Sequence, residues 1–391
     1  MRPSFSIYVH LPYCVRKCPY CDFNTYAVAR FPEERYVAAL RREAEHASDD
    51  PCWSGRRVAT VFFGGGTPSL FSPQSLGSLL EDFDRMWGLE ADAEITMEAN
   101  PGSFEGSAAA RLGGFRACGI DRISFGAQSF EPRHLMTLGR IHSPQDTVDA
   151  VAAARQAGFQ NLSCDLIFAI PGQTVADWAA DLRRLVELGP DHVSAYNLTY
   201  EDGTPMTGLK KAGLLVPAEE ETELEMFRLA RCELAAAGYA QYEVSNFARP
   251  RRQARHNLAY WTWRDYLGLG AGAHGFAAGD GRGHRDWGRR YANKRIPEAY
   301  MSAGRGCWHA SAEELTRDMA VAEYLMVGLR LSCGIDEDDL RQRFGVTLEA
   351  AAPRTGEMIE GGLLVREGSA VRLTERGLEI ADAVISRLAA S

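Results

Sequence analysis

Three cysteines lie within eight residues near the start of the chain, at Cys14, Cys18 and Cys21. Thiolates at this spacing can hold three irons of a cubane [4Fe–4S] cluster and leave the fourth iron without a protein ligand, free to bind a small molecule. A closed zinc site is the main alternative, but it needs four nitrogen or sulfur ligands, and the next cysteine, Cys52, has no partner nearby in the sequence. A disulfide is a weaker alternative, because it would leave one of the three thiols unpaired. The spacing therefore favours an iron–sulfur cluster with one open iron.

A glycine run, GGGTPS at residues 64–69, follows an apolar stretch of the strand type. Three glycines after a strand often mark only a turn. Their functional use would be to let the backbone approach an amino or carboxylate group of a ligand. The candidates for that approach are Gly65, Gly66 and Thr67.

Four polar residues, at Glu98, Gln128, Arg140 and Asp165, stand at or just beyond the ends of further predicted strands. A carboxylate at such a place can accept hydrogen bonds from ribose hydroxyls, and an arginine can pair with a carboxylate. Each residue alone could equally be part of a salt bridge or a helix cap. Together with the cysteines they predict a site for a zwitterionic nucleoside.

A basic and aromatic segment lies further along, with HNLAYW at residues 256–261. Flat aromatic rings suit a porphyrin, and His256 is a candidate axial ligand of heme iron. Four nearby arginines could meet heme propionates. The alternatives are an aromatic cluster at a domain interface and a solvated basic loop.

The elements that must position these residues alternate between strand and helix. Strands are predicted at residues 5–10, 58–63, 94–98, 122–125, 161–167 and 192–198, with helices at 32–46, 72–87, 107–118, 144–157, 175–188 and 218–237. This alternation predicts an α/β fold with six parallel βα units. Six units are too few for a closed eight-fold barrel, so we expect an open, partial (β/α)6 barrel resembling the TIM type. Ligands bind at the carboxyl ends of such strands, where the candidate residues fall.

The residue composition of the sequence changes after residue 240. Residues 241–310 are basic, aromatic and glycine-rich, and we expect them to connect two domains, residues 1–240 and residues 311–391. The last part predicts helices from residue 311 to 330 and from 336 to 344, a hairpin near 361–373 and a closing helix at 375–388, which is a mostly helical, winged-helix-like outline. Its acidic run at residues 336–339 makes DNA an unfavourable partner.

The composition is that of an ordinary globular protein of 391 residues, with a formal net charge of −9 from 43 basic and 52 acidic side chains. This balance argues against nucleic acid as a partner, because phosphate binding needs a basic face. Nine cysteines without a visible pairing pattern indicate a reducing compartment. Neither a signal peptide nor an apolar stretch of membrane-spanning length is recognisable, so we expect a cytoplasmic protein.

Taken together, the motifs carry a resemblance to the radical S-adenosylmethionine (SAM) superfamily. From end to end the chain resembles the coproporphyrinogen oxidase-like branch of that superfamily, which includes heme chaperones. The motifs that carry the resemblance are YVHLPYC at 8–14, FFGGGTPS at 62–69, SFGAQSF at 124–130, LGRIHS at 138–143, DLIFAIPGQT at 165–174 and HNLAYW at 256–261.

The resemblance implies roles for these residues. The three cysteines would ligate a [4Fe–4S] cluster whose free iron takes the amino and carboxylate groups of SAM. An electron from the reduced cluster then cleaves the sulfonium to give a 5′-deoxyadenosyl radical. Gly65, Gly66 and Thr67 would approach the methionine moiety, and further SAM contacts would come from Tyr8, Glu98, Gln128, Arg140 and Asp165.

Phe23 departs from the pattern of the anaerobic oxidase, which has a fourth cysteine at this position. Only thirteen residues precede Cys14, whereas the oxidase has a longer N-terminal arm. Both differences favour a heme chaperone that delivers heme to apo-hemoproteins, among them respiratory enzymes at the membrane. A homodimer that depends on the cluster is a further expectation. The alternatives are an oxygen-independent coproporphyrinogen III oxidase and a radical SAM methyltransferase.

Overall fold

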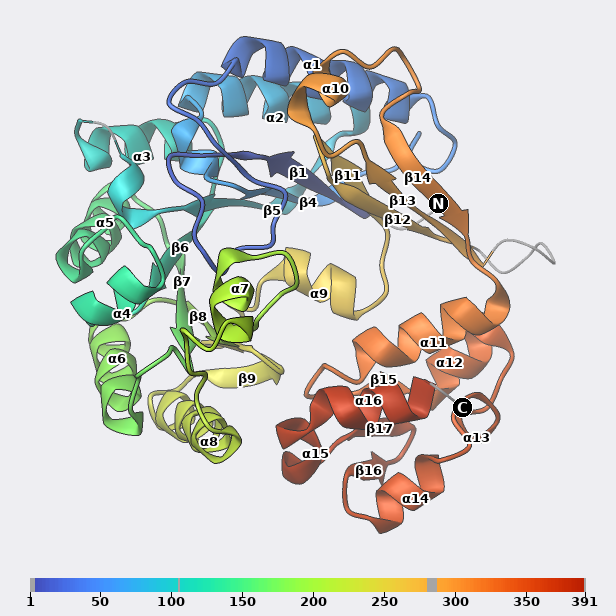
Figure 1. The fold of residues 1–391 in the computed structure, drawn as a ribbon. Coiled ribbons are helices and arrows are strands. Elements are labelled where there is room, and N and C mark those ends of the chain that lie inside the picture. Colours follow the sequence, from blue (N-terminus) through green and yellow to red (C-terminus); the bar gives the residue numbers. More distant parts are fainter. Residues whose placement is uncertain (1–3, 105, 280–286, 390–391) are drawn as a thin grey trace.

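The computed structural model describes residues 4–104, 106–279 and 287–389. Its main feature is a sheet of twelve strands, in the order β14-β13-β12-β11-β1-β4-β5-β6-β7-β8-β10-β9. The strands form an arc with helices along its outer side, while the short helices α7 and α9 lie on the inner side (Figure 1). The arc is open, as expected for a partial barrel.

Six parallel strands form the centre of the sheet in sequence order, which confirms the six predicted βα units. They are β1 (Phe5–Leu11), β4 (Val58–Gly65), β5 (Leu89–Ala99), β6 (Arg122–Gln128), β7 (Asn161–Phe168) and β8 (His192–Asn197). The helices outside them are α1 (Glu33–Ser48), α2 (Pro73–Trp87), α3 (Ala108–Ala117), α5 (Pro144–Gln156), α6 (Val175–Leu188) and α8 (Glu220–Ala236).

Side chains alternate along the strands in a way that gives the sheet two different faces. On β1, Phe5, Ile7 and Val9 belong to the main apolar core. The alternate residues of β1, among them Tyr8 and His10, are on the opposite face because successive side chains of a strand point to opposite sides. The arc therefore has a polar inner face, which suits a polar ligand.

Six short strands extend the sheet at both edges. They are β9 (Ala240–Glu243), β10 (Asn246–Ala248), β11 (Tyr266–Leu269), β12 (His274–Ala278), β13 (Gly288–Asn293) and β14 (His309–Glu314). The sequence did not predict them, and the helix expected from residue 311 is wrong at its start. Alanine and glutamate in β14 favour a helix, but antiparallel pairing with β13 holds this segment extended, and helix α11 (Arg317–Gly328) begins only after it.

Several short elements interrupt the βα pattern on the side of the strand ends. They are β2 (Tyr13–Cys14), β3 (Tyr26–Ala27), η1 (Pro68–Leu70), η2 (Pro101–Ser103), α4 (Pro132–Thr137), α7 (Pro205–Lys211), α9 (Arg255–Trp261) and α10 (Pro297–Met301).

The C-terminal part has its own apolar core and the predicted outline of helices, hairpin and helix. Its three-stranded sheet has the order β15-β17-β16. The predicted last helix is broken at Ile380 into two. The elements are β15 (Ile335–Asp336), α12 (Glu337–Phe344), α13 (Leu348–Ala351), α14 (Thr355–Glu360), β16 (Leu364–Glu367), β17 (Ala370–Leu373), α15 (Glu375–Glu379) and α16 (Ala381–Ala389).

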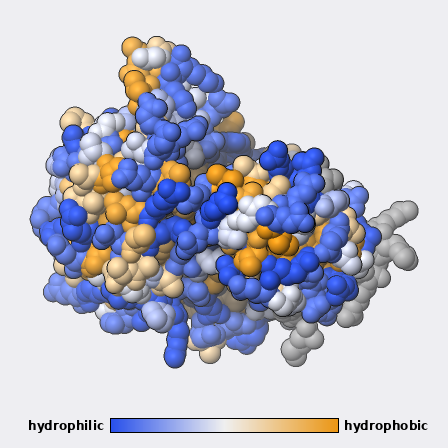
Figure 2. All heavy atoms as spheres, turned by 90° about the horizontal axis from the view of Figure 1, so that it is seen from below, coloured by the Kyte–Doolittle hydropathy of each residue, from blue (hydrophilic) through white to orange (hydrophobic). Residues whose placement is uncertain are grey.

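The surface seen from below is mainly hydrophilic, with separate apolar patches (Figure 2). Within the described parts of the chain, no helix combines the length and the apolar character needed to cross a bilayer.

Candidate functional site

The three cysteines lie on a loop that leaves the carboxyl end of β1. β2 and β3 pair in parallel and close the base of this loop. Cys14 is buried, while Cys18 and Cys21 are partly exposed. Burial, with smaller contributions from nearby Cys21 and Cys18, raises the pKa of the Cys14 thiol to about 11, so the three thiols lie within electrostatic range of one another. A thiolate at Cys14 therefore needs a compensating positive charge, which a coordinating metal supplies.

The cysteine loop suits a cluster better than a single ion. In residues 4–104, 106–279 and 287–389, no three His, Cys, Asp or Glu side chains converge on one point that a metal ion could occupy. A cubane cluster binds each thiolate to a different iron, so its ligands need not converge. The donor set is compatible with a [4Fe–4S] cluster and does not form a closed zinc site.

The glycine run packs directly against the cysteine loop. The Gly66 amide donates to the Leu11 carbonyl at 2.8 Å and the Thr67 amide to the Tyr13 carbonyl at 2.9 Å. A Cβ atom on Gly66 would lie 2.6 Å from the Tyr13 carbonyl oxygen, and one on Gly65, whose φ is +110°, would lie 2.5 Å from the His10 ring. Contacts within the chain thus already require glycine at both positions. The approach of a methionine moiety to them stays a prediction.

Two carboxylates, Glu98 of β5 and Asp165 of β7, lie on either side of Ser124 of β6. Glu98 Oε2 accepts from the Gly65 amide at 3.0 Å, and both oxygens of Asp165 accept from Ser124 Oγ at 3.3 Å. Burial, with a smaller contribution from the charge of Asp165, raises the pKa of Glu98 to about 7. Burial also raises the pKa of Asp165. Such carboxylates are stabilised by any ligand that brings hydroxyl or amino donors.

Arg140 and Asn100 join the cysteine loop to the ends of β5 and β6. Arg140 Nη1 donates to Cys18 Sγ at 3.8 Å, and its Nη2 donates to the Gly126 carbonyl at 2.8 Å and to Asn100 Oδ1. Asn100 Nδ2 donates in turn to Thr67 Oγ1 at 3.0 Å. Asn100 was not among the predicted site residues, although it immediately follows the end of β5, two residues after Glu98.

Tyr8 reaches the cysteine loop through His10. The Tyr8 hydroxyl donates to His10 Nδ1 at 2.9 Å, and His10 Nε2 donates to the Asn24 carbonyl at 2.9 Å. His10 was also not selected from the sequence. Its two-residue spacing from Tyr8 was the signal that could have found it, because that spacing puts both side chains on one face of β1.

His256 lies near the start of β4 and beside Tyr8, with 6.4 Å between the centroids of the two rings. It is 1% exposed, with Nδ1 2.7 Å from Thr60 Oγ1 and Nε2 2.8 Å from the Tyr260 hydroxyl. Because Thr60 gives its proton to Ser6, it accepts from His256 Nδ1, and Nε2 is left to accept from Tyr260. Burial lowers the pKa of His256 to about 3, so the ring is neutral. Binding heme iron would require His256 to give up one of these bonds, and the predicted role as heme ligand stays untested.

The structure thus brings the cluster and SAM candidates together, and His256 adjoins them at Tyr8. The three cysteines and seven of the eight residues predicted to contact SAM are at or near the carboxyl ends of β1, β4, β5, β6 and β7, whereas Tyr8 is in the middle of β1. A small pocket beside the cysteine loop is lined by Cys18, Thr67, Asn100 and Arg140 among others. His256 lies toward the opposite ends of the strands.

A partial α/β barrel with three cysteines on the loop after its first strand is the arrangement of radical SAM proteins. The family model for the radical SAM superfamily matches residues 8–185, and that for the HemN C-terminal domain matches residues 315–380. Heme chaperone HemW of Escherichia coli is 37% identical over 96% of this chain and 95% of its own. HemW of Mycobacterium tuberculosis is 36% identical, covering 98% and 94%. The chain belongs to the HemW-like family of radical SAM proteins.

Two further comparisons extend this relationship. A mitochondrial protein of Bos taurus, radical S-adenosyl methionine domain-containing protein 1, is 37% identical over 98% of this chain and 87% of its own. The solved structure of coproporphyrinogen III oxidase (HemN) from Escherichia coli superimposes with a TM-score of 0.81, covering 99% of this chain and 90% of that one. Its sequence identity is 22%, so this likeness speaks for the fold alone.

Proposed function

We propose that the chain is a heme chaperone that binds heme and transfers it to apo-hemoproteins, among them respiratory enzymes at the membrane. In this proposal Cys14, Cys18 and Cys21 hold a [4Fe–4S] cluster, and the residues around Glu98 and Arg140 hold SAM. When bound, the reduced cluster supplies the electron that cleaves SAM. The protein groups orient the two cofactors and balance the charge of the thiolates.

The observation that carries this proposal is Phe23. It stands where the anaerobic coproporphyrinogen oxidase has a fourth cysteine, and its side chain is 60% exposed at the cysteine loop. A phenylalanine cannot ligate iron, and an exposed ring next to a cofactor site is available to an apolar ligand or partner. Near-full-length identity to HemW proteins supports the same conclusion.

We infer that three successive parts of the chain have different roles. Residues 1–240 hold the cluster and SAM, residues 241–310 connect, and residues 311–391 form the C-terminal domain. We further propose that the protein acts in the cytoplasm and that cluster binding favours a homodimer.

Anaerobic reconstitution followed by two parallel incubations tests the proposal. One sample receives heme and then an apo-hemoprotein, and the other receives coproporphyrinogen III with SAM and a reductant. We expect heme to bind and then move to the acceptor, while coproporphyrinogen III stays unchanged. Stoichiometric formation of protoporphyrinogen would instead establish the oxidase.

Two cysteine variants serve as matched controls for the cluster. Cys18→Ser should lose most of the reconstituted iron, whereas Cys307→Ser, which changes an exposed thiol outside the loop, should keep it. Equal iron content in the two variants would contradict the assignment of the cluster ligands.

A further inference from the structure

The chain turns sharply where β6 ends, immediately beside the candidate SAM site. Gln128 has a φ of +67°, and the Ser129 amide donates to the Ala127 carbonyl at 2.9 Å across it. This three-residue γ-turn with a positive φ at its centre is rare and strained for a residue other than glycine. The pairing of β6 with β7 also shifts register between Gly126 and Gln128. Such a conformation persists only where the surroundings hold it.

Asp181, on helix α6 outside the barrel, restrains this turn through two hydrogen bonds. Its Oδ2 accepts from Ser129 Oγ at 2.8 Å and its Oδ1 accepts from the Phe130 amide at 2.7 Å. Asp181 is 2% exposed and Ser129 is fully buried. The helix itself is fixed at its start by a capping box between Thr174 and Asp177. Both carboxylate oxygens of Asp181 are therefore directed at the two residues that follow Gln128.

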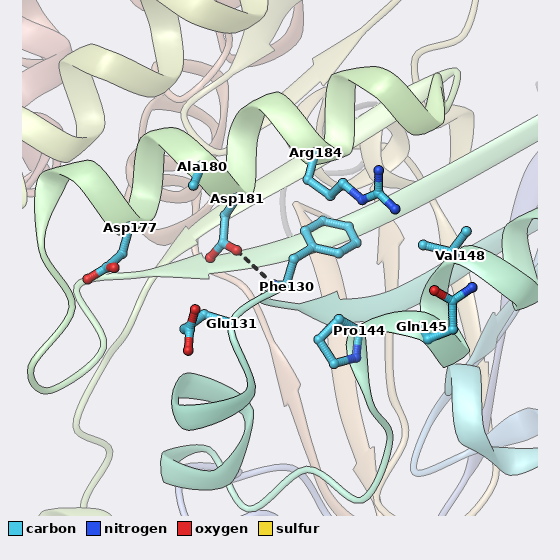
Figure 3. A pocket seen from close by; sticks show the side chains of 9 residues that line it. All are labelled: Phe130, Glu131, Pro144, Gln145, Val148, Asp177, Ala180, Asp181 and Arg184. Atoms are coloured by element: carbon cyan, nitrogen blue, oxygen red, sulfur yellow. Dashed lines mark hydrogen bonds between the residues drawn. The ribbon is translucent and has the colours of Figure 1, made fainter.

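Packing is incomplete beside this turn. A cavity of about 280 Å³ lies between α5 and α6 and is lined by Phe130, Val148, Asp181 and Arg184 among others. Figure 3 shows the Asp181 carboxylate pointing across this cavity wall to the backbone at Phe130. The pocket reaches Phe130 but not the buried Ser129, so on the side of α6 the turn is restrained by the two bonds to Asp181.

The same turn carries groups of the candidate SAM site. The Gly126 carbonyl accepts from Arg140 Nη2 at 2.8 Å, and the Ala127 carbonyl accepts from His142 Nε2 at 3.1 Å. The Gln128 side chain folds back over Gly126, where a Cβ would lie 2.7 Å from Gln128 Nε2. The conformation of the turn therefore sets the positions of both Gln128 and Arg140.

We propose that Asp181 is a positioning residue of the cofactor site, which holds the strained turn at Gln128 through Ser129 and Phe130 and thereby aligns Gln128 and Arg140 for SAM. This inference rests on the proposed binding of SAM. Asp181 does not touch the cofactor itself and acts through the backbone.

Four variants of the full-length reconstituted protein test this role. Asp181→Ala removes both bonds, and Ser129→Ala removes one. Asp181→Asn retains an acceptor for the Phe130 amide and gains a donor for Ser129 Oγ, so it is the conservative rescue. Arg184→Gln is the matched control, because it changes a side chain of the same helix that lines the same cavity. For each variant, iron per chain, the thermal midpoint and the SAM dissociation constant are measured, the last from the change that SAM causes in the EPR spectrum of the reduced cluster.

We expect Asp181→Ala to weaken SAM binding about tenfold while iron per chain stays at the wild-type level. Ser129→Ala should be intermediate, and Asp181→Asn and Arg184→Gln should match the wild type. If Asp181→Ala does not fold, the SAM dissociation constant and the iron content of Ser129→Ala test the positioning role instead. A folded variant with unchanged SAM affinity would overturn the positioning role only, whereas a wild-type protein that binds no SAM would overturn the proposed function as well.

Discussion

His256 illustrates how a residue selected for chemistry can also carry structure. Its ring stacks on Phe62 at 5.1 Å between centroids, and its two nitrogens bridge Thr60 of β4 and Tyr260 of its own helix. These contacts fasten α9 to the inner side of the barrel. The HNLAYW stretch therefore has a structural use that is independent of heme.

His256→Ala tests which use dominates. Because the substitution leaves Thr60 and Tyr260 without their buried partner, we expect it to lower the free energy of unfolding by roughly 2–4 kcal/mol in the absence of heme. Tyr260→Phe, which removes one bond, should cost about 1 kcal/mol. Urea denaturation of the heme-free protein measures both effects. Unchanged stability together with an altered spectrum of bound heme would favour the axial ligand.

At the level of elements, the turn after β11 supports the cysteine loop. Asn24, three residues after Cys21, donates through Nδ2 to the carbonyls of Ala271 at 2.9 Å and Arg295 at 2.8 Å. Gly272 has a φ of +79°, and a Cβ there would collide with the Asn24 side chain. A segment distant in sequence thus sets the position of the loop that carries the cysteines.

Gly272→Ala should therefore impair the cluster. Gly158→Ala is the matched control, because Gly158 also has a positive φ, +91°, but open space where the Cβ would lie. Both variants should lose about 1–2 kcal/mol of stability through the backbone conformation. Only Gly272→Ala should also displace Asn24 and lower the iron bound per chain after reconstitution. Equal iron content in the two variants would show that the loop does not depend on this turn.

The observed helices and strands also show how much of the fold and of the candidate site can be predicted from the sequence. The six βα units and the strand-end position of Glu98 and Asp165 followed from periodicity, which reflects local burial. The edge strands could not be predicted in this way, because β11 is held by pairing with β1, about 260 residues earlier in the chain. The role of Asp181 could not be predicted for the same reason, because a polar residue on a helix gives no sign that it binds a distant turn.

At the scale of the whole molecule, the segment around α9 joins the two cores. His256 and Tyr260 contact the inner side of the barrel, whereas Trp263 belongs to the core of the C-terminal domain. Its ring lies 5.3 Å from that of Phe344 and 6.4 Å from that of Tyr324, measured between centroids. One short stretch of sequence thus couples the barrel to the C-terminal domain.

Trp263→Ala should weaken this coupling more than the loss of an exposed contact between the barrel and the C-terminal domain would. Trp263 is 6% exposed, so its removal leaves a cavity and should cost about 3–5 kcal/mol. Trp261→Ala is the matched control, because Trp261 is only partly buried and its contact with Arg330, at 5.2 Å from the ring, is worth about 1 kcal/mol. Far-UV circular dichroism during urea denaturation, with limited proteolysis of residues 317–389, should reveal an earlier separate transition in Trp263→Ala and a single shared one in Trp261→Ala. If both variants unfold in one transition with equal midpoints, the two cores are joined through other contacts, such as the Arg228–Glu379 ion pair at 2.7 Å.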